Sequence, residues 1–197
     1  MMQPIMTPQE SLDVIKKIID VRRIQYENNG RIIFMWGAVV MAAGIIQFVL
    51  TESPLSRYSW TIWLFTMVPM FIYSFIEGGR NARKNRRKIH SGDNIIKLAW
   101  LMTGIMAMLN GFIFPDRFGI GFTTVMYLPF CVAALVTALS LQRLLFVGYV
   151  VLSTFVAYTA LFIPFYYHSL VAALIGFFLF FLPGLTLMRD YRKRTYV

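Results

Sequence analysis

The residue types that usually catalyse reactions or hold metal ions are missing from the apolar parts of this chain. Its six most apolar stretches contain no Asp, Glu, Lys, Arg or His, although membrane enzymes and ion-coupled pumps rely on ionisable groups inside the bilayer. His90 and His168 lie far apart in the sequence, without a second histidine or an acid at metal-ligand spacing. Gly78-Gly79 lacks the Lys-Ser or Lys-Thr of a phosphate-binding loop. We therefore expect no catalytic residue, metal site or cofactor, and two solvent-exposed histidines.

Neutral polar and aromatic side chains remain as candidate ligand contacts. They could line a cavity for a small neutral or aromatic molecule. Two alternatives explain them without a ligand: hydroxyl and amide groups cross-link membrane helices, and Trp and Tyr form belts at the level of the lipid head groups. The candidate cavity or ligand-binding residues are Gln47, Trp60, Trp63, Asn110, Tyr127, Tyr166 and Tyr167. The deeper hydroxyl groups belong to Thr66, Ser74, Thr103, Thr137, Ser153, Thr154 and Thr159.

The composition indicates that these residues are carried by membrane-spanning helices. The 197 residues are 58% hydrophobic and 14% charged, with a mean hydropathy of +0.63, whereas a soluble domain is roughly 45–50% apolar and about 25% charged. A spanning helix needs about 20 mostly apolar residues. The expected fold class is all-α, with six transmembrane helices. The six stretches that fit or come close are Ile32–Leu50, Trp60–Ile76, Leu98–Phe114, Thr123–Leu141, Leu144–Ile163 and Ser169–Met188.

The distribution of Lys and Arg predicts the orientation of these helices. Seventeen of the nineteen basic residues fall on one side of the six-span arrangement, and only Arg57 and Arg117 fall on the other. Cytoplasmic loops of membrane proteins carry the basic excess. We expect a multi-pass membrane protein with both termini in the cytoplasm. Its parts are a cytoplasmic helix over 1–30, a transmembrane domain over 31–188 with a basic loop at 77–97, and a basic tail over 189–197.

The basic loop after the second span has the highest charge density in the chain. If it is helical, Arg80, Arg83, Lys84 and Arg87 share one face. Each basic residue near an anionic leaflet contributes about 1 kcal/mol of attraction, so these four residues are candidate contacts for anionic lipids. Nucleic-acid binding is not expected, because the loop lacks interleaved aromatic residues and a known recognition fold.

The first thirty residues predict an amphipathic helix. Thr7-Pro8-Gln9-Glu10 has the pattern of a capping box, and Asn28-Asn29-Gly30 supplies a stop signal. The helix could lie on the membrane surface, on a protein partner or on the cytoplasmic ends of the chain's own spans. Its apolar positions are Leu12, Ile15, Ile18 and Ile19.

The prolines suggest three tandem helical hairpins. Pro54, Pro115 and Pro164 fall in outer loops, whereas Pro69, Pro129 and Pro183 fall inside spans two, four and six. If the hairpins are equivalent, the last three prolines kink their helices and face a common axis, where a cavity would open. Chance explains the pattern equally simply, since proline is tolerated in membrane helices.

Small residues predict close packing of some helices. The pairs that favour such packing are Ala38-x-x-x-Ala42, Ala134-x-x-x-Ala138 and Ala172-x-x-x-Gly176. Cys131 is expected to be a buried apolar residue.

Three motifs carry a family resemblance: Thr7-Pro8-Gln9-Glu10-Ser11-Leu12, the stop at Asn28-Asn29-Gly30, and Phe34-Met35-Trp36-Gly37. With them, the stretch from Met6 to Leu50 resembles the opening of an uncharacterised family of small bacterial six-span membrane proteins. The resemblance continues as a hydropathy pattern through span six. It implies a bacterial cytoplasmic membrane protein and transfers no catalytic or binding residue.

A weaker resemblance rests on Ala38 and Ala42. The substrate-binding subunits of energy-coupling-factor transporters also have six spans and use Ala-x-x-x-Ala on the first span to dock their transmembrane partner, but they lack the charged N-terminal helix.

Taken together, the sequence predicts a non-enzymatic partner-binding or scaffold subunit, with a protein partner at the N-terminal helix or the basic loop. The alternative is a solute-binding or transport component for a small neutral or aromatic molecule.

Overall fold

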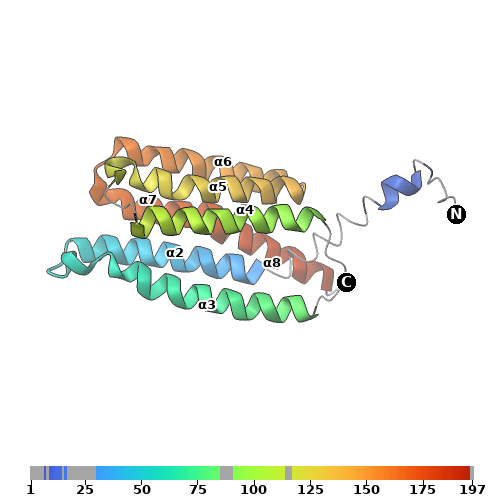
Figure 1. Cartoon of the computed structure of the whole chain (residues 1–197), viewed down its shortest axis with the longest axis horizontal. Coiled ribbons are helices and arrows are strands. Elements are labelled where there is room, and N and C mark those ends of the chain that lie inside the picture. The colour runs from blue at the N-terminus through green and yellow to red at the C-terminus, as the bar shows by residue number, and fades with distance from the viewer. Residues whose placement is uncertain are drawn as a thin grey trace.

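The chain forms a bundle of helices in the computed structural model, which describes residues 7, 9–14, 16, 30–84, 91–113 and 117–195. The helices run side by side along the long axis of the molecule (Figure 1). A π-helical turn at Leu109–Ile113 follows α4, and another at Phe177–Phe181 joins α7 to α8 without a break. The helices are α2 (Gly30–Thr51), α3 (Thr61–Lys84), α4 (Ser91–Met108), α5 (Phe122–Ser140), α6 (Leu144–Thr159), α7 (His168–Gly176) and α8 (Leu182–Thr195).

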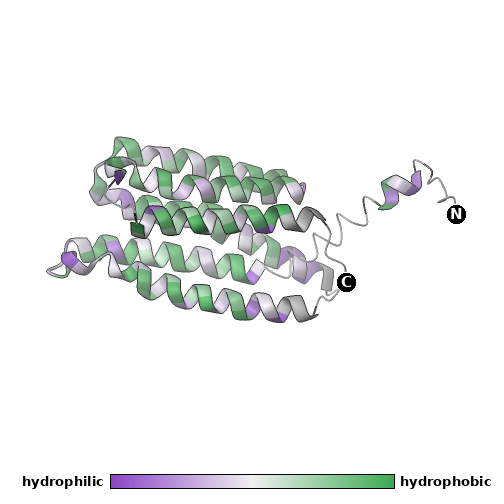
Figure 2. Ribbon diagram, viewed as in Figure 1, coloured by the Kyte–Doolittle hydropathy of each residue, from purple (hydrophilic) through white to green (hydrophobic). Residues whose placement is uncertain are grey.

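Within the described part of the chain, five helical segments are long and apolar enough to cross a membrane. Their middles are apolar and their ends more polar (Figure 2), as expected for helices that cross a hydrocarbon layer about 30 Å thick. A sixth apolar stretch, Ile95–Gly111, is shorter and corresponds to the predicted third span. The five segments are Gly30–Thr51, Ser56–Arg80, Gly119–Ser140, Leu144–Phe162 and Phe165–Lys193.

Several helices extend beyond the apolar stretches that predicted them. The predicted loop at 77–97 is helical at both ends, because α3 continues to Lys84 and α4 begins at Ser91. The predicted tail after residue 188 belongs to α8 as far as Thr195. Lys and Arg are good helix formers, so a helix can continue through basic residues after its apolar segment ends. Hydropathy therefore predicted where the apolar segments stop, and not where the helices stop.

Glycines bring α2 into direct backbone contact with the α7–α8 helix. Gly30, Gly37 and Gly44 recur every seven residues on one face of α2, and all three are buried. A Cβ atom added at Gly37 would overlap the backbone of Phe181, and one added at Gly30 would lie 2.8 Å from Leu187 Cβ. We call this contact the glycine seam; on the other helix it includes Gly176, which faces Val40, and Gly184, which faces Phe34.

The glycine seam makes the contact between the first and last helices the most extensive in the bundle. Consecutive helices also pack against each other, α2 with α3, α4 with α5, α5 with α6 and α6 with α7. The main contacts of α3 are with α2, so α3 lies at the edge. Gly30, the last residue of the predicted stop signal, is the first residue of α2. Asn28 and Asn29 lie outside the described residues.

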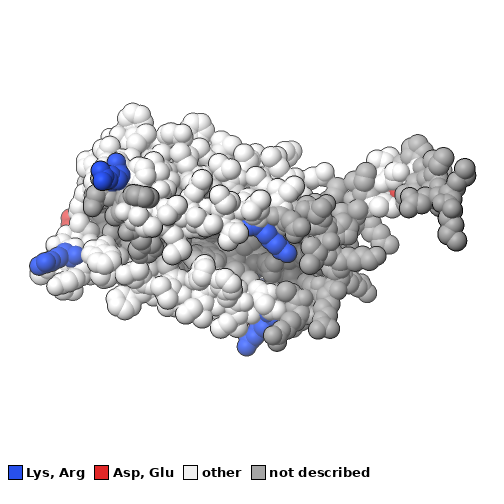
Figure 3. Space-filling model, in the orientation of Figure 1, with Lys and Arg blue, Asp and Glu red and all other residues white. Residues whose placement is uncertain are grey.

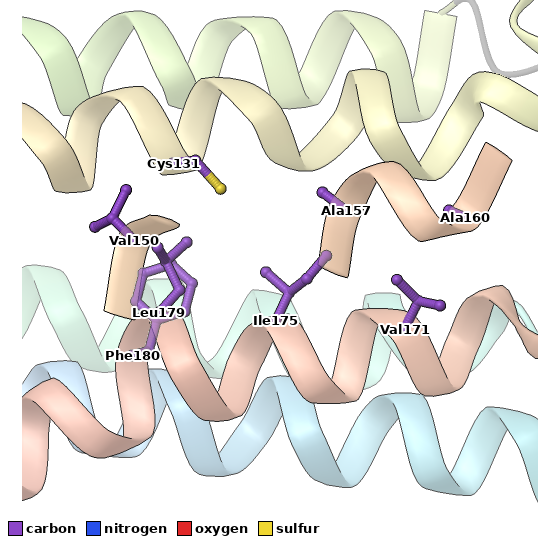
Figure 4. Packing of buried hydrophobic residues seen from close by; sticks show 8 residues of the cluster. All are labelled: Cys131, Val150, Ala157, Ala160, Val171, Ile175, Leu179 and Phe180. Carbon is purple, nitrogen blue, oxygen red and sulfur yellow. The ribbon is translucent and has the colours of Figure 1, made fainter. Parts of the chain in front are cut away.

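The apolar core lies between α5, α6 and the α7–α8 helix. Its buried side chains point toward one another from these helices (Figure 4). Cys131 is 3% exposed and belongs to this core, which confirms its predicted role as a small buried apolar residue. The labelled members of the cluster are Cys131, Val150, Ala157, Ala160, Val171, Ile175, Leu179 and Phe180.

The predicted capping box at the start of the chain is confirmed. The Thr7 amide donates to Glu10 Oε2 at 2.8 Å, and the Glu10 amide donates to Thr7 Oγ1 at 3.3 Å. In the described part of this segment, Leu12 and Val14 are 56% and 41% exposed. These apolar side chains are not covered by the bundle. Ile15, Ile18 and Ile19 lie outside the described residues.

We expect the capping box to depend on pH. The pKa of Glu10 is lowered, mainly because the Thr7 amide donates to its carboxylate. The box therefore stabilises the helix above the ordinary pKa of Glu, and this stabilisation is lost as the pH falls through the lowered value. Thr7→Ala should open the first turn about fivefold more often at neutral pH. Amide hydrogen exchange of residues 9–14 in the full chain measures both effects, and Glu10→Gln should abolish the pH dependence.

Candidate functional site

Two tryptophan side chains bind α3 to α2. Trp63 Nε1 donates to Gln47 Oε1 at 2.6 Å, and Trp36 Nε1 donates to Ser74 Oγ at 2.8 Å. The two bonds lie eleven residues apart on both helices, which fixes the antiparallel register of the pair. Gln47 and Trp63, two of the predicted ligand-binding residues, thus bind each other and hold two helices together.

An apolar groove of about 360 Å³ lies between these two hydrogen bonds. The Thr66 hydroxyl in its wall donates to the Ile62 carbonyl at 2.7 Å, so that hydroxyl is already satisfied by its own helix. The groove is therefore suited to an apolar occupant. We call it the α2–α3 groove; it is lined by Met35, Val39 and Ala42 of α2 and by Phe65, Thr66, Pro69, Met70 and Tyr73 of α3.

The outer tyrosines pack against the other end of α2. The rings of Tyr166 and Tyr167 lie 4.9 and 6.0 Å from that of Phe48, and the Tyr166 hydroxyl donates to Glu52. Trp60, just before α3, is 56% exposed. Exposed and half-exposed aromatic residues at the ends of apolar helices fit the predicted aromatic belt.

The remaining predicted ligand-binding residues lie elsewhere in the bundle. Tyr127 of α5 packs 6.1 Å from Phe130 between ring centroids, and Phe130 in turn contacts the rings of Trp100 and Phe180. Asn110 is half-buried in the π-helical turn after α4. The seven predicted residues are therefore distributed over the α2–α3 interface, the outer turns and the α4–α5 side.

The deeper hydroxyl groups are bonded to the protein backbone. Each of the seven donates a hydrogen bond to a backbone carbonyl. Thr103 of α4 reaches across to the Pro129 carbonyl of α5 at 3.0 Å. Thr124, which the sequence reasoning did not single out, donates from α5 to the Ala157 carbonyl of α6 at 2.8 Å. The bonds of Thr103 and Thr124 cross-link helices, whereas the other six hydroxyl groups bond to carbonyls of their own helix.

The three prolines inside spans are not equivalent. α3 and α5 continue as helices through Pro69 and Pro129, whereas Pro183 is the second residue of α8, just after the π-helical turn Phe177–Phe181. A π turn is a common way for a helix to accommodate an irregularity. The predicted common axis also differs from the packing, because α3 lies mainly against α2. The glycine seam places α2, and not α3, beside the α7–α8 helix.

The predicted basic face is helical as far as the structure describes it. Arg80, Arg83 and Lys84 belong to α3, and Arg87 lies outside the described residues. Arg80 forms a 3.8 Å ion pair with Glu77, and its side chain is 71% exposed. On the visible face, Lys and Arg leave the middle of the bundle uncharged (Figure 3). Exposed guanidinium groups beside an apolar surface suit contact with lipid head groups.

An ion pair that the sequence reasoning missed joins the α5–α6 turn to α8. Arg143 Nη1 pairs with Asp190 Oδ2, and the two side chains are 12% and 34% exposed. The Arg143 guanidinium also lies 5.6 Å from the centre of the Phe146 ring. One feature of the sequence could have indicated this ion pair: Asp190 is the only acid among the basic residues of the tail.

His168 is buried, so the prediction of a solvent-exposed residue is wrong. It is 4% exposed, with Nδ1 2.9 Å from Thr123 Oγ1 and Nε2 3.4 Å from the Ile163 carbonyl. The outer turns cover it where α5 and α7 begin. This polar cluster joins the two helices. His90 lies outside the described residues.

The described residues contain no group of His, Cys, Asp and Glu that could hold a metal ion. No family model, curated protein or solved structure matches the chain with significance.

Proposed function

We propose that this chain is a non-enzymatic integral membrane protein of the bacterial inner membrane that acts as a partner-binding or scaffold subunit. In this proposal it has six spans and both termini in the cytoplasm. The shorter Ile95–Gly111 stretch crosses as the third span, with the flanking turns of α4 completing its length. An even number of spans keeps the ends of the chain on the side with the basic excess.

The proposal rests on the hydrogen bonds that the interior polar groups form within the protein. The seven deep hydroxyl groups all bond to backbone carbonyls, and Gln47 is bonded to Trp63. A solute-binding protein for polar molecules directs such groups at its ligand. Here six of the seven hydroxyl groups bond within their own helix, and Thr103 bonds to the neighbouring helix. Polar groups that are already satisfied by the protein favour a structural role over catalysis or polar-solute transport.

The N-terminal helix supports binding to a partner. Its capping box gives it a defined start, and Leu12 and Val14 remain exposed. An apolar side chain exposed on a charged helix suits a partner or a membrane surface. The basic ends of the helices, on the cytoplasmic side in this proposal, provide a second surface for binding a partner.

Co-purification in a mild detergent tests this role. The expected result is an assembly heavier than the 22.8 kDa chain in native mass spectrometry, and its loss in Leu12→Glu. The matched control is Asp13→Glu, which keeps the charge of the neighbouring position and should retain the assembly. A chain that runs alone, or with a small molecule bound in both variants, would contradict the scaffold role and favour transport.

The orientation is tested by cysteine labelling of intact cells. With Cys131 replaced by Ala, a cysteine at Arg192 should be shielded from an impermeant thiol reagent, because the basic end is cytoplasmic. Cysteines at Ser56 and Arg117 should be labelled, since both positions lie at the opposite end. Permeabilised cells provide the control, in which the cysteine at Arg192 must react. Labelling at Arg192 in intact cells would invert the proposed topology.

A further inference from the structure

The α2–α3 groove has the dimensions and surface of a site for a hydrocarbon chain. Its lining is almost entirely apolar, its volume is about 360 Å³, and it is open on one side. Because α3 packs mainly on α2, the groove lies at the edge of the bundle. The molecules that surround such an edge in a bilayer are lipids, whose acyl chains match this lining.

Two arginines lie at one end of the same groove. On α2, Arg31 precedes the groove residue Met35 by four residues, and on α3, Arg80 follows the groove residue Tyr73 by seven. Residues four or seven apart share one face of a helix. Both arginines are exposed. Their guanidinium groups are therefore on the groove side of both helices.

The antiparallel register brings the two arginines to the same level. The Trp36–Ser74 hydrogen bond fixes that register. Arg31 is five residues beyond Trp36, and Arg80 is six residues beyond Ser74 in the same direction. At 1.5 Å per residue, both lie roughly 7–9 Å beyond the bond. They thus flank the end of the groove on the side of the basic helix ends.

The acid that pairs with Arg80 leaves room for an anion. Glu77 pairs with Arg80 at 3.8 Å, but the Arg80 side chain remains 71% exposed. An exposed pair at this distance on one helix is weak. A phosphate can therefore engage Arg80, and bidentate binding of phosphate is a property of the guanidinium group.

We propose that the α2–α3 groove binds one anionic phospholipid, with an acyl chain against Met35, Ala42 and Pro69 and its phosphate between Arg31 and Arg80. The charge of the two arginines complements an anionic head group, and the apolar lining complements the chain. The site rests on the membrane placement proposed above, but it requires neither the proposed orientation nor a protein partner.

Lipid exchange followed by native mass spectrometry tests the head-group contact. The full chain is purified in detergent and mixed with phosphatidylglycerol and phosphatidylcholine of identical acyl chains. The wild type should retain one phosphatidylglycerol in preference to phosphatidylcholine. Arg31→Gln with Arg80→Gln should lower that preference roughly tenfold, whereas Arg57→Gln with Arg117→Gln at the other end should leave it unchanged.

A second pair of variants tests the acyl-chain contact. Ala42→Leu fills the groove and should lower the retention of both lipids equally. Gly148→Leu is the matched control, because Gly148 has no neighbour within 4 Å of an added Cβ and lies away from the groove. Thr66→Leu fills the groove from its other wall and should repeat the effect of Ala42→Leu. Size-exclusion profiles confirm that each variant is folded.

The proposal is overturned if the wild type shows no preference for the anionic lipid, or if both arginine pairs lower that preference equally. Retention of both lipids unchanged in Ala42→Leu and Thr66→Leu would also exclude the groove. Because lipid binding is measured in detergent on the isolated chain, these results do not depend on partner binding or on orientation. Failure of the lipid site is thus distinct from failure of the scaffold role.

Discussion

Gly37→Ala should lower the free energy of unfolding by about 3 kcal/mol. The added Cβ atom would overlap the backbone nitrogen and Cα of Phe181. Backbone atoms cannot rotate away as a side chain does, so α2 and the α7–α8 helix must separate. Overpacking typically costs 1–3 kcal/mol and occasionally more. Loss of close contact along the glycine seam adds to this cost, since van der Waals packing is a main source of helix association in a bilayer.

Gly184→Ala should have a comparable effect, because its Cβ would overlap the backbone of Phe34 on the opposite side of the seam. Gly104→Ala and Gly148→Ala are the matched controls, since an added Cβ at either position meets nothing within 4 Å. Both controls should be neutral or stabilising by up to about 1 kcal/mol. Unfolding in mixed micelles with increasing dodecyl sulfate measures all four variants. If Gly37→Ala is as stable as the controls, α2 and the α7–α8 helix are not in backbone contact.

Asp190→Asn should destabilise the bundle by about 2–3 kcal/mol. Its carboxylate is the counter-charge of Arg143, whose side chain is only 12% exposed. Removing one member of a buried pair costs about 3–5 kcal/mol, and the smaller value reflects the 34% exposure of Asp190. The same unfolding titration measures the change.

A double variant distinguishes loss of the ion pair from other effects of substitutions in α8. Arg143→Leu combined with Asp190→Leu removes both charges and should be more stable than Asp190→Asn alone, because no charge then loses its counter-charge. Arg192→Gln, on the exposed surface of α8, should change stability by less than about 0.5 kcal/mol. Equal losses in Asp190→Asn and Arg192→Gln would show that the pair contributes nothing specific.

Features that depend on single residues or on neighbours in the chain were predictable. The apolar stretches predicted the helices, since a run of apolar residues is informative whatever packs against it. The capping box was visible because its two partners are three residues apart. The hydroxyl groups were expected to line a cavity or to cross-link helices, whereas six of the seven bond to a carbonyl three or four residues earlier in their own helix.

The ends and surroundings of the helices were less predictable. His168 was assigned to solvent because it stands between apolar stretches, yet the outer turns bury it against Thr123. Asp190 was counted only as part of a basic tail, yet it pairs with Arg143. In both cases the partner is more than forty residues away, where no local pattern connects the two positions.

By itself, the sequence determined that this is an all-helical chain with several helices of membrane-spanning hydropathy, and where those helices lie in the chain. Only the tertiary structure decided which faces meet. Gly30, Gly37 and Gly44 recur every seven residues, a pattern that the sequence analysis did not single out, and nothing in the sequence assigns them to the α7–α8 helix. The reason is physical: lipid chains are as apolar as the helix surfaces, so hydropathy does not distinguish a packed face from a lipid-facing one. Close contact is decided instead by the shapes of two surfaces, and at Gly37 and Phe181 that contact joins the first helix of the bundle to the last.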